Sequence, residues 1–204
     1  MRDAKKLVLG LLMAFLVTFN IAPVSAAEKI TLVAADDHDF GYVRTLFKHW
    51  IDADKDGCNT RSEVLITEAI VKPVVGAGCF LAGGKWRSPY DGKVFTNPTG
   101  LDIDHMVPLA EAWRSGAWAW TAAQRMAYAN DLEDPRTLLA VTATLNRSKG
   151  DKDVAQWLPP KGQCTYISNW IAVKWRFDLS IDPIESEFLR TKILSCNITN
   201  VVIQ

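Results

Sequence analysis

The sequence lacks an excess of basic residues, is poor in histidine and contains no apolar run long enough to cross a membrane. Its 23 lysines and arginines are matched by 23 aspartates and glutamates, so a broad cationic surface is not expected. Only three histidines are present, which leaves few candidates for a base that works near neutral pH. The apolar run Leu7–Phe19 is shorter than the roughly 20 residues of a membrane-spanning helix, so we do not expect an integral membrane protein.

The first 27 residues have the layout of a secretory signal peptide. Basic residues precede the apolar run and the small residues of VSAA follow it, which predicts cleavage after Ala26 or Ala27. Cleavage removes three basic residues and one acidic residue, which leaves residues 28–204 with a formal charge of −2. We therefore expect one exported domain, secreted or periplasmic in a bacterium, with no stable membrane insertion and no protein partner implied.

Cysteine is also scarce, and all four cysteines lie in the part of the chain expected to be exported: Cys58, Cys79, Cys164 and Cys196. An even number of cysteines in an exported chain predicts two disulfides. Three pairings are open, and the separation into an early and a late couple favours Cys58–Cys79 with Cys164–Cys196. The alternative is a zinc site, which is disfavoured because no two cysteines stand at metal-knuckle spacing.

Apolar residues recur every three or four positions between Phe40 and Ile51, which predicts an amphipathic helix. This helix would run into DADKDGCNTRSE, which fits the calcium-loop pattern D-x-D-x-D-G-x5-E. The matching positions are Asp52, Asp54, Asp56, Gly57 and Glu63. Asn59 departs from the pattern, because such loops usually carry an aliphatic residue in its place. A single structural calcium site and a solvated acidic turn are the two interpretations, and we favour the first.

The rest of the chain alternates strand-like and helix-like stretches, which is typical of an α+β fold. Residues 71–98 are rich in glycine, proline and aromatics, which predicts short strands and turns. A helical stretch is expected over Ala110–Leu132, interrupted near SGAW, with Thr121 as the N-cap of its second part. The run Thr137–Leu145 is apolar and β-branched and predicts mainly strand, and the tail Tyr166–Leu194 mixes both patterns.

Polar residues flank the two predicted strands in the order D-H-x-x-P, then N-x-x-K-G-D. This order resembles the HNH nucleases of the His-Me finger superfamily. The runs DIDHMVPLAEAWRSGAW, NRSKGDKDVAQWLPP, HWIDADKDGCNTR and GKWRSPYDG are similar to secreted HNH endonuclease family proteins, which are related to the C-terminal domain of GmrSD-type restriction enzymes. The resemblance implies a ββα-metal core over residues 99–161. Residues 28–98 would form a small N-terminal helix and acidic-loop region, and residues 162–204 a C-terminal packing segment.

Hydrolysis of a phosphodiester needs a base for the attacking water and a cation that neutralises the growing negative charge. The resemblance implies that His105 is the general base and that Asp104 and Asn146 bind one divalent metal ion. Oxygen ligands suit Mg²⁺, or Mn²⁺. One carboxylate and one amide supply a single negative charge, which leaves the ion net positive toward the phosphate.

Two consecutive residues of a regular strand point to opposite faces of the sheet. Asp104 and His105 can therefore share a site only where the strand ends, twists or bulges, and Pro108 is consistent with an early end. Asp102 lies on the same face as Asp104, and we expect it to support the ligands indirectly.

The sequence departs from the HNH pattern at two positions. The middle asparagine corresponds to Thr137, whose hydroxyl retains one hydrogen bond of the amide and which we also expect to act indirectly. Asn130 is the alternative for that role, although its distance from Asn146 does not suit a tight hairpin. Asn146 replaces a histidine, which favours magnesium or manganese over zinc.

The basic residues nearest to these motifs are Arg147, Lys149 and Lys152, which we assign to phosphate contacts. The alternative is that they are ordinary helix-terminal charges that pair with Asp151 and Asp153.

The function that fits these observations is an exported, metal-dependent endonuclease that cuts DNA, in preference to RNA, with little sequence specificity. The alternative is a noncatalytic, calcium-stabilised binding protein of the envelope on a nuclease scaffold. The joint presence of Asp104, His105 and Asn146 favours the enzyme. A hydrolase that pairs His105 with a serine ranks low, because Ser115 and Ser148 lie in no nucleophile-elbow context.

Overall fold

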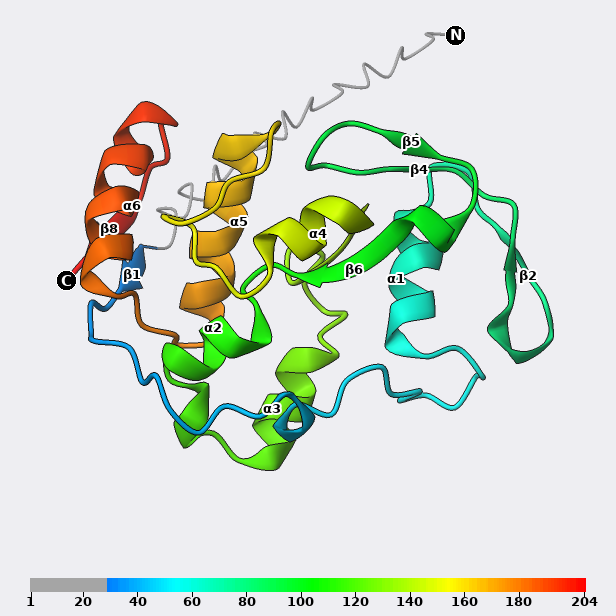
Figure 1. The fold of residues 1–204 in the computed structure, drawn as a ribbon, viewed down its shortest axis with the longest axis horizontal. Helices are drawn as coiled ribbons and strands as arrows, with labels where there is room; N and C mark the ends of the chain where they lie inside the picture. Colours follow the sequence, from blue (N-terminus) through cyan, green and yellow to red (C-terminus); the bar gives the residue numbers. More distant parts are fainter. Residues whose placement is uncertain (1–28) are drawn as a thin grey trace, which may run out of the picture.

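The computed structural model describes residues 29–204, and the expected signal peptide and its cleavage site lie outside these residues. No helix of the described part combines the length and the apolar character that a membrane span requires. The protein is a mixed α+β structure (Figure 1). Its strands and α-helices are β1 (Ile30–Leu32), α1 (Thr60–Glu68), β2 (Val74–Val75), β3 (Leu81–Ala82), β4 (Trp86–Arg87), β5 (Val94–Phe95), β6 (Leu101–His105), α2 (Leu109–Arg114), α3 (Ala122–Ala129), β7 (Leu138–Thr142), α4 (Ala143–Lys149), α5 (Gln163–Arg176), α6 (Pro183–Ser195) and β8 (Val201–Ile203).

The centre of the fold is an antiparallel pair, β6 with β7, followed directly by α4. Leu101 pairs with Thr142 at one end and His105 with Leu138 at the other. Because strand residues alternate between faces, Leu101 and Ile103 are buried in an apolar cluster beneath α1. In Figure 1, β6 lies between α4 and α1. The other face of β6, which carries two aspartates, is left for contact with α4.

A second and larger apolar cluster surrounds α5. Ile167, Trp170 and Ile171 of α5 are almost completely buried, and α6 packs alongside. The parallel pair of β1 with β8 closes this cluster, so that the first and last described strands lie side by side (Figure 1). This half of the molecule supports the central strands from the side away from α1.

Both expected disulfides are present, and the described residues contain no free cysteine. The Cys58–Cys79 bond, with a Cα–Cα distance of 5.0 Å, joins the acidic loop to the hairpin region of β2 and β3. The Cys164–Cys196 bond, with a Cα–Cα distance of 5.4 Å, joins the start of α5 to the end of α6. The predicted pairing is therefore confirmed.

The prediction of an amphipathic helix from Phe40 to Ile51 is wrong, because the only helical part of this segment is one 3₁₀ turn, Arg44–Leu46. The segment runs along one side of the molecule past α2 and α3 (Figure 1). Phe47 is completely buried and packs against the rings of Trp113 and Tyr128. The apolar spacing that resembles a helix thus serves contacts with other elements.

Elsewhere the expected elements are present with changed limits. The helical stretch is broken as predicted, and Thr121 closes a capping box at the start of α3. The expected strand over Thr137–Leu145 ends at Thr142, because α4 begins at Ala143. The short strands of residues 71–98 are β2 to β5.

Candidate active site

A cavity of about 400 Å³ lies at the end of β6. Its polar lining comes from the segment before α1, from β6, and from α4 with the turn after it. These side chains are Tyr42, Arg44, Asp104, His105, Asn146, Arg147 and Asp151. The structure therefore brings together the three residues that the sequence assigned to the base and to the metal ligands, from the end of one strand and from one helix.

Asp104 and His105 both line this cavity although they are consecutive in β6. The strand ends at His105, and the chain then turns through Pro108 into α2. Both residues pair in register with β7, so their side chains leave opposite faces of the strand, and the cavity at the end of the strand borders both of them. Both side chains are nearly inaccessible, with 4% and 5% of their surfaces exposed.

The His105 ring is held by the backbone of α3. Its Nε2 atom lies 3.0 Å from the carbonyl oxygen of Ala129. A carbonyl oxygen can only accept, so Nε2 carries the proton of the neutral ring and Nδ1 is left as an acceptor. Burial lowers the pKa of His105 to about 3, against the opposing effect of this hydrogen bond. The imidazole is therefore neutral near pH 7, which is the form that accepts a proton.

Asp104 is fixed by two buried partners through one of its oxygens. Its Oδ2 accepts from Lys149 Nζ at 2.6 Å and from the hydroxyl of Tyr90. Among the described residues no hydrogen bond engages Oδ1 of this carboxylate. Burial raises the pKa of Asp104, and the lysine charge opposes that effect. The second oxygen is thus available to a ligand in the cavity.

The structure corrects the phosphate contact assigned to Lys149. This side chain has no exposed surface, and Nζ also donates to the carbonyl oxygens of His105 at 2.8 Å and Met106 at 2.9 Å. Its three protons are all used inside the protein. Lys149 therefore fixes the end of β6 and does not reach solvent.

Asn146 lies on α4 opposite Asp102. Its Nδ2 atom is 3.4 Å from Oδ2 of Asp102, and the Arg147 guanidinium lies 3.4 Å from the same oxygen. This arrangement directs the amide nitrogen of Asn146 toward Asp102 and leaves its carbonyl oxygen for a cation. Arg147 is 73% exposed in its side chain. Lys152 is exposed as well and donates to the Ser148 carbonyl.

Asp151 and Asp153, the alternative partners for the basic residues of α4 and the following turn, bind other groups. Asp151 pairs with Arg114, with a distance of 3.7 Å between its Oδ2 and Nη1 of the arginine. Asp153 accepts from the backbone nitrogens of Ala155 and Gln156. Neither carboxylate therefore pairs with Arg147 or Lys152.

Thr137 is completely buried and does not line the cavity. Its hydroxyl donates to Asp131 at 2.6 Å, and its carbonyl oxygen accepts from the nitrogen of Met106 at 2.9 Å. Arg176 binds the same aspartate. Thr137 thus holds the loop before β7 against the end of β6.

Sequence reasoning missed Tyr42 and Arg44, because both lie in the segment that was expected to be a helix. Arg44 has no ion-pair partner among the described residues, and its charge contributes to the lowered pKa of His105. Trp50 was also missed, although its ring centroid is 5.5 Å from that of His105. No local pattern marks these positions, since they reach the site only through long-range packing.

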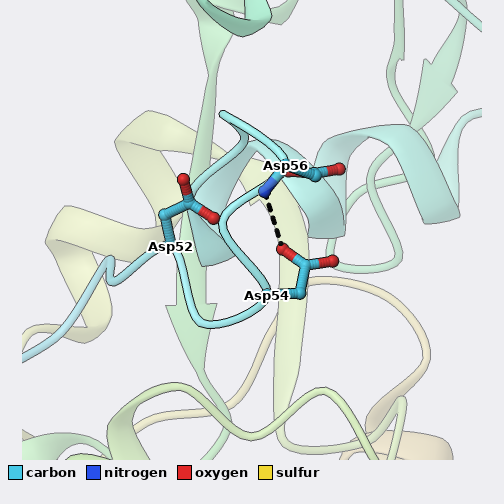
Figure 2. Close-up of side chains that lie close together, drawn as sticks. All are labelled: Asp52, Asp54 and Asp56. Atoms are coloured by element: carbon cyan, nitrogen blue, oxygen red, sulfur yellow. Dashed lines mark hydrogen bonds between the residues drawn. The ribbon is translucent and has the colours of Figure 1, made fainter.

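The acidic loop lies outside this cavity. One oxygen from each of Asp52, Asp54 and Asp56 lies within 4.8 Å of the others, and all three side chains are exposed (Figure 2). The loop is tightened by bonds from backbone nitrogens, among them Gly57 to Asp52 at 3.1 Å. Glu63, the last position of the pattern, is not part of this group of three, although burial raises its pKa and the three aspartates raise that pKa further.

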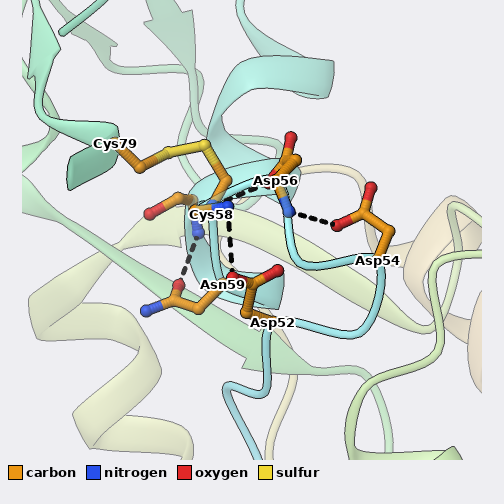
Figure 3. Close-up of a disulfide and its surroundings, with 8 residues drawn as sticks. Asp52, Asp54, Asp56, Cys58, Asn59 and Cys79 are labelled. Atoms are coloured by element: carbon orange, nitrogen blue, oxygen red, sulfur yellow. Dashed lines mark hydrogen bonds between the residues drawn. A yellow bond between two sulfur atoms is a disulfide. The ribbon is translucent and has the colours of Figure 1, made fainter. Parts of the chain in front are cut away.

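Two neighbouring features shape this loop. The Cys58–Cys79 disulfide holds its end (Figure 3). Asn59, which departs from the calcium-loop pattern, is the N-cap of α1 and accepts from the nitrogen of Ser62 at 3.1 Å. The polar residue at this position is thus explained by helix capping.

Comparison with known proteins supports the resemblance. Residues 68–189 match the family described as GmrSD restriction endonucleases, C-terminal domain. The chain is also 44% identical over 182 residues to an uncharacterized secreted protein of Arthroderma benhamiae (strain ATCC MYA-4681 / CBS 112371), a match that covers 87% of this chain and 88% of the relative. No solved structure matches the chain. The family match spans more than half of the sequence and includes Asp104, His105 and Asn146, and the chain belongs to the GmrSD restriction endonuclease C-terminal domain family.

Proposed function

We propose that this protein is an exported, metal-dependent endonuclease that hydrolyses phosphodiester bonds of DNA, in preference to RNA, with little sequence specificity. One observation carries the proposal. The imidazole of His105, whose Nδ1 has no hydrogen bond within the described part of the chain, lines one cavity together with Asp104 and Asn146. Membership in a family of restriction endonuclease domains supports it, as does the strand–strand–helix order of β6, β7 and α4, which we interpret as a ββα-metal core.

The donor set fits one hard divalent cation, Mg²⁺ or Mn²⁺. Oδ1 of Asp104 is not engaged by any hydrogen bond of the described residues, and the amide nitrogen of Asn146 is directed to Asp102, which leaves the amide oxygen. An oxygen pair of this kind suits magnesium or manganese better than zinc. When bound, the ion would supply positive charge against the scissile phosphate.

The protein's own residues would carry the proton transfer. Nδ1 of His105 accepts a proton from the attacking water while Nε2–H stays bonded to the Ala129 carbonyl. The backbone bond keeps the ring from rotating and fixes which nitrogen is basic. Burial disfavours the resulting imidazolium, so we expect the proton to pass to solvent or to the departing oxygen once the bond from phosphorus to that oxygen is broken.

Arg44 takes over the phosphate contact that the sequence assigned to Lys149. Its guanidinium belongs to the lining of the cavity and has no ion-pair partner among the described residues. Arg147 also lines the cavity and Lys152 is exposed on the turn after α4, and we keep both as phosphate contacts beside Arg44. So few phosphate contacts predict weak binding that tolerates many sequences.

Export is supported by two disulfides, which form in oxidising compartments, and by the relative that is named a secreted protein. We place the protein outside the cytoplasm on these grounds. For the acidic loop we keep the proposal of a structural calcium ion, held by Asp52, Asp54 and Asp56 with Glu63.

The test is cleavage of plasmid DNA, and in parallel of RNA, by the mature protein with magnesium and with a chelator. His105→Ala should reduce the rate by about 10²- to 10⁴-fold because it removes the base. His38→Ala is the matched control, since that ring stacks on Trp118 and does not line the cavity. Cleavage by His105→Ala at the parent rate would remove His105 from the mechanism, and no cleavage by the parent with any divalent cation would favour the noncatalytic binding protein.

A further inference from the structure

The end of α3 contacts the proposed base at two consecutive positions, and the next residue binds a neighbouring segment. The ring of Tyr128 lies 6.2 Å from that of His105, centroid to centroid. The carbonyl oxygen of Ala129 accepts from the imidazole. Asn130 does not touch the histidine, but its side chain binds the segment that carries Trp50.

The side chain of Asn130 makes three hydrogen bonds to the backbone. Nδ2 donates to the carbonyl oxygens of Lys48 at 2.8 Å and Met126 at 2.7 Å. Oδ1 accepts from the nitrogen of Ile51 at 3.1 Å, and it shares the single proton of the Thr60 hydroxyl, 2.9 Å away, with the carbonyl oxygen of Ile51. An amide has two donors and one oxygen with two lone pairs, so this environment suits asparagine and not aspartate.

The bonds to Lys48 and Ile51 bracket Trp50, which has a left-handed backbone with φ 59°. Such a conformation is unfavourable for a bulky residue and persists where the surroundings enforce it. Its indole lies beside the His105 imidazole, with ring centroids 5.5 Å apart and planes inclined by 31°. The strained residue therefore packs against the base.

We propose that Asn130 is a positioning residue for the nuclease reaction. It holds residues 48–51 so that the indole of Trp50 confines the imidazole of His105. The carbonyl oxygen of Ala129, the residue before Asn130, sets the tautomer of that imidazole. This inference rests on the proposed function, because it assumes that His105 is the base. It assigns a role to a residue that binds neither phosphate nor metal.

The kinetic test compares Asn130→Ala, Asn130→Asp and Trp50→Ala with the parent on plasmid DNA. We expect kcat to fall about 10- to 100-fold in each, as is usual when the partner that orients a catalytic group is lost. KM should change by less than about threefold, because Arg44 and the metal ligands are untouched. The double variant Asn130→Ala/Trp50→Ala should lose no more than the worse single variant, since the asparagine acts through the indole.

Thr121→Ala is the control for a merely structural effect. It removes the capping box of α3 at the end far from His105 and so weakens the helix without touching the site. We expect its kcat to stay within about twofold of the parent. An equal loss of kcat in Thr121→Ala and Asn130→Ala, or independent losses in the double variant, would overturn the proposal. Trp50→Phe, which keeps an aromatic cover, carries the test if Asn130→Ala does not fold.

A spectroscopic readout separates this inference from the proposed function. With three histidines in the chain, the imidazole nitrogens can be assigned by ¹⁵N NMR, and His105 should show one protonated nitrogen, Nε2. Asn130→Ala should give a mixture of tautomers or faster exchange of that proton. If the parent cuts no nucleic acid with any divalent cation, the proposed function fails, and this spectrum still decides the positioning. An unchanged spectrum in Asn130→Ala refutes it.

Discussion

Lys149→Met is the substitution that best separates the buried ion pair seen in the structure from the phosphate contact expected of this lysine. The structure gives Nζ three acceptors: the carboxylate of Asp104 at 2.6 Å and two carbonyl oxygens at 2.8 and 2.9 Å. Methionine fills a similar volume and removes every donor. The variant is left with a buried carboxylate that keeps only the hydroxyl of Tyr90.

Removing one partner of a buried ion pair costs about 3–5 kcal/mol, because the other charge stays buried without compensation. We expect a loss of that size in the free energy of unfolding of Lys149→Met, measured by urea denaturation at pH 7. Adding Asp104→Asn should recover part of the loss, since the uncompensated charge is then absent. Arg147→Met is the matched control on the same helix. Its side chain is 73% exposed, so its effect should stay within about 0.5 kcal/mol.

A phosphate-binding lysine would behave in the opposite way. Its loss would leave stability unchanged and would reduce the slope of log affinity against log salt by about 0.9. A Lys149→Met protein within about 1 kcal/mol of the parent would therefore refute the buried pair and restore the contact inferred from sequence.

Three further predictions concern charge. Arg44→Ala should lower kcat/KM. In binding experiments on the inactive His105→Ala background, we expect a slope of log affinity against log salt of about −2 to −3 for duplex DNA, and Arg44→Ala should reduce the size of this slope by about 0.9. Calcium should raise the thermal midpoint of the parent without restoring activity in the absence of magnesium, and Glu63→Gln should weaken that rise; equal midpoints would return the loop to a solvated turn. Burial raises the pKa of Glu68 from 4.5 to about 7, so the folded state holds this proton more tightly than the unfolded state. Stability should fall by at most about 3 kcal/mol as pH rises from 4.5 to 7, and urea melts of Glu68→Gln should show a flatter profile.

The motif residues could be identified from sequence because their spacing is local. Asp104 and His105 end one strand, and Asn146 lies on the helix that follows its partner strand. Strand pairing places these positions together without help from the rest of the fold. The two disulfides were equally predictable, since each joins cysteines that are close in sequence, 21 and 32 residues apart.

The segment before α1 could not be placed in the same way. Its apolar spacing suits a helix, but Phe47 is buried between aromatic rings of α2 and α3, and Asn130 takes the backbone partners that helical bonds would use. Local periodicity reports that residues are buried, and the partner that buries them decides the backbone conformation. Arg44 and Trp50 reach the site through these contacts, so their roles were hidden.

The burial of Lys149 was open to inference and shows how far helical spacing can be used. Asn146 and Lys149 are three residues apart on α4, so they share a helix face. Asp102 and Asp104 are two apart on β6, so they share a strand face. If the amide must face the strand to bind a metal with Asp104, the lysine on the same helix face must meet the carboxylates too. The lysine charge that the sequence assigned to a substrate phosphate is therefore directed inward by the same geometry that brings the proposed metal ligands together.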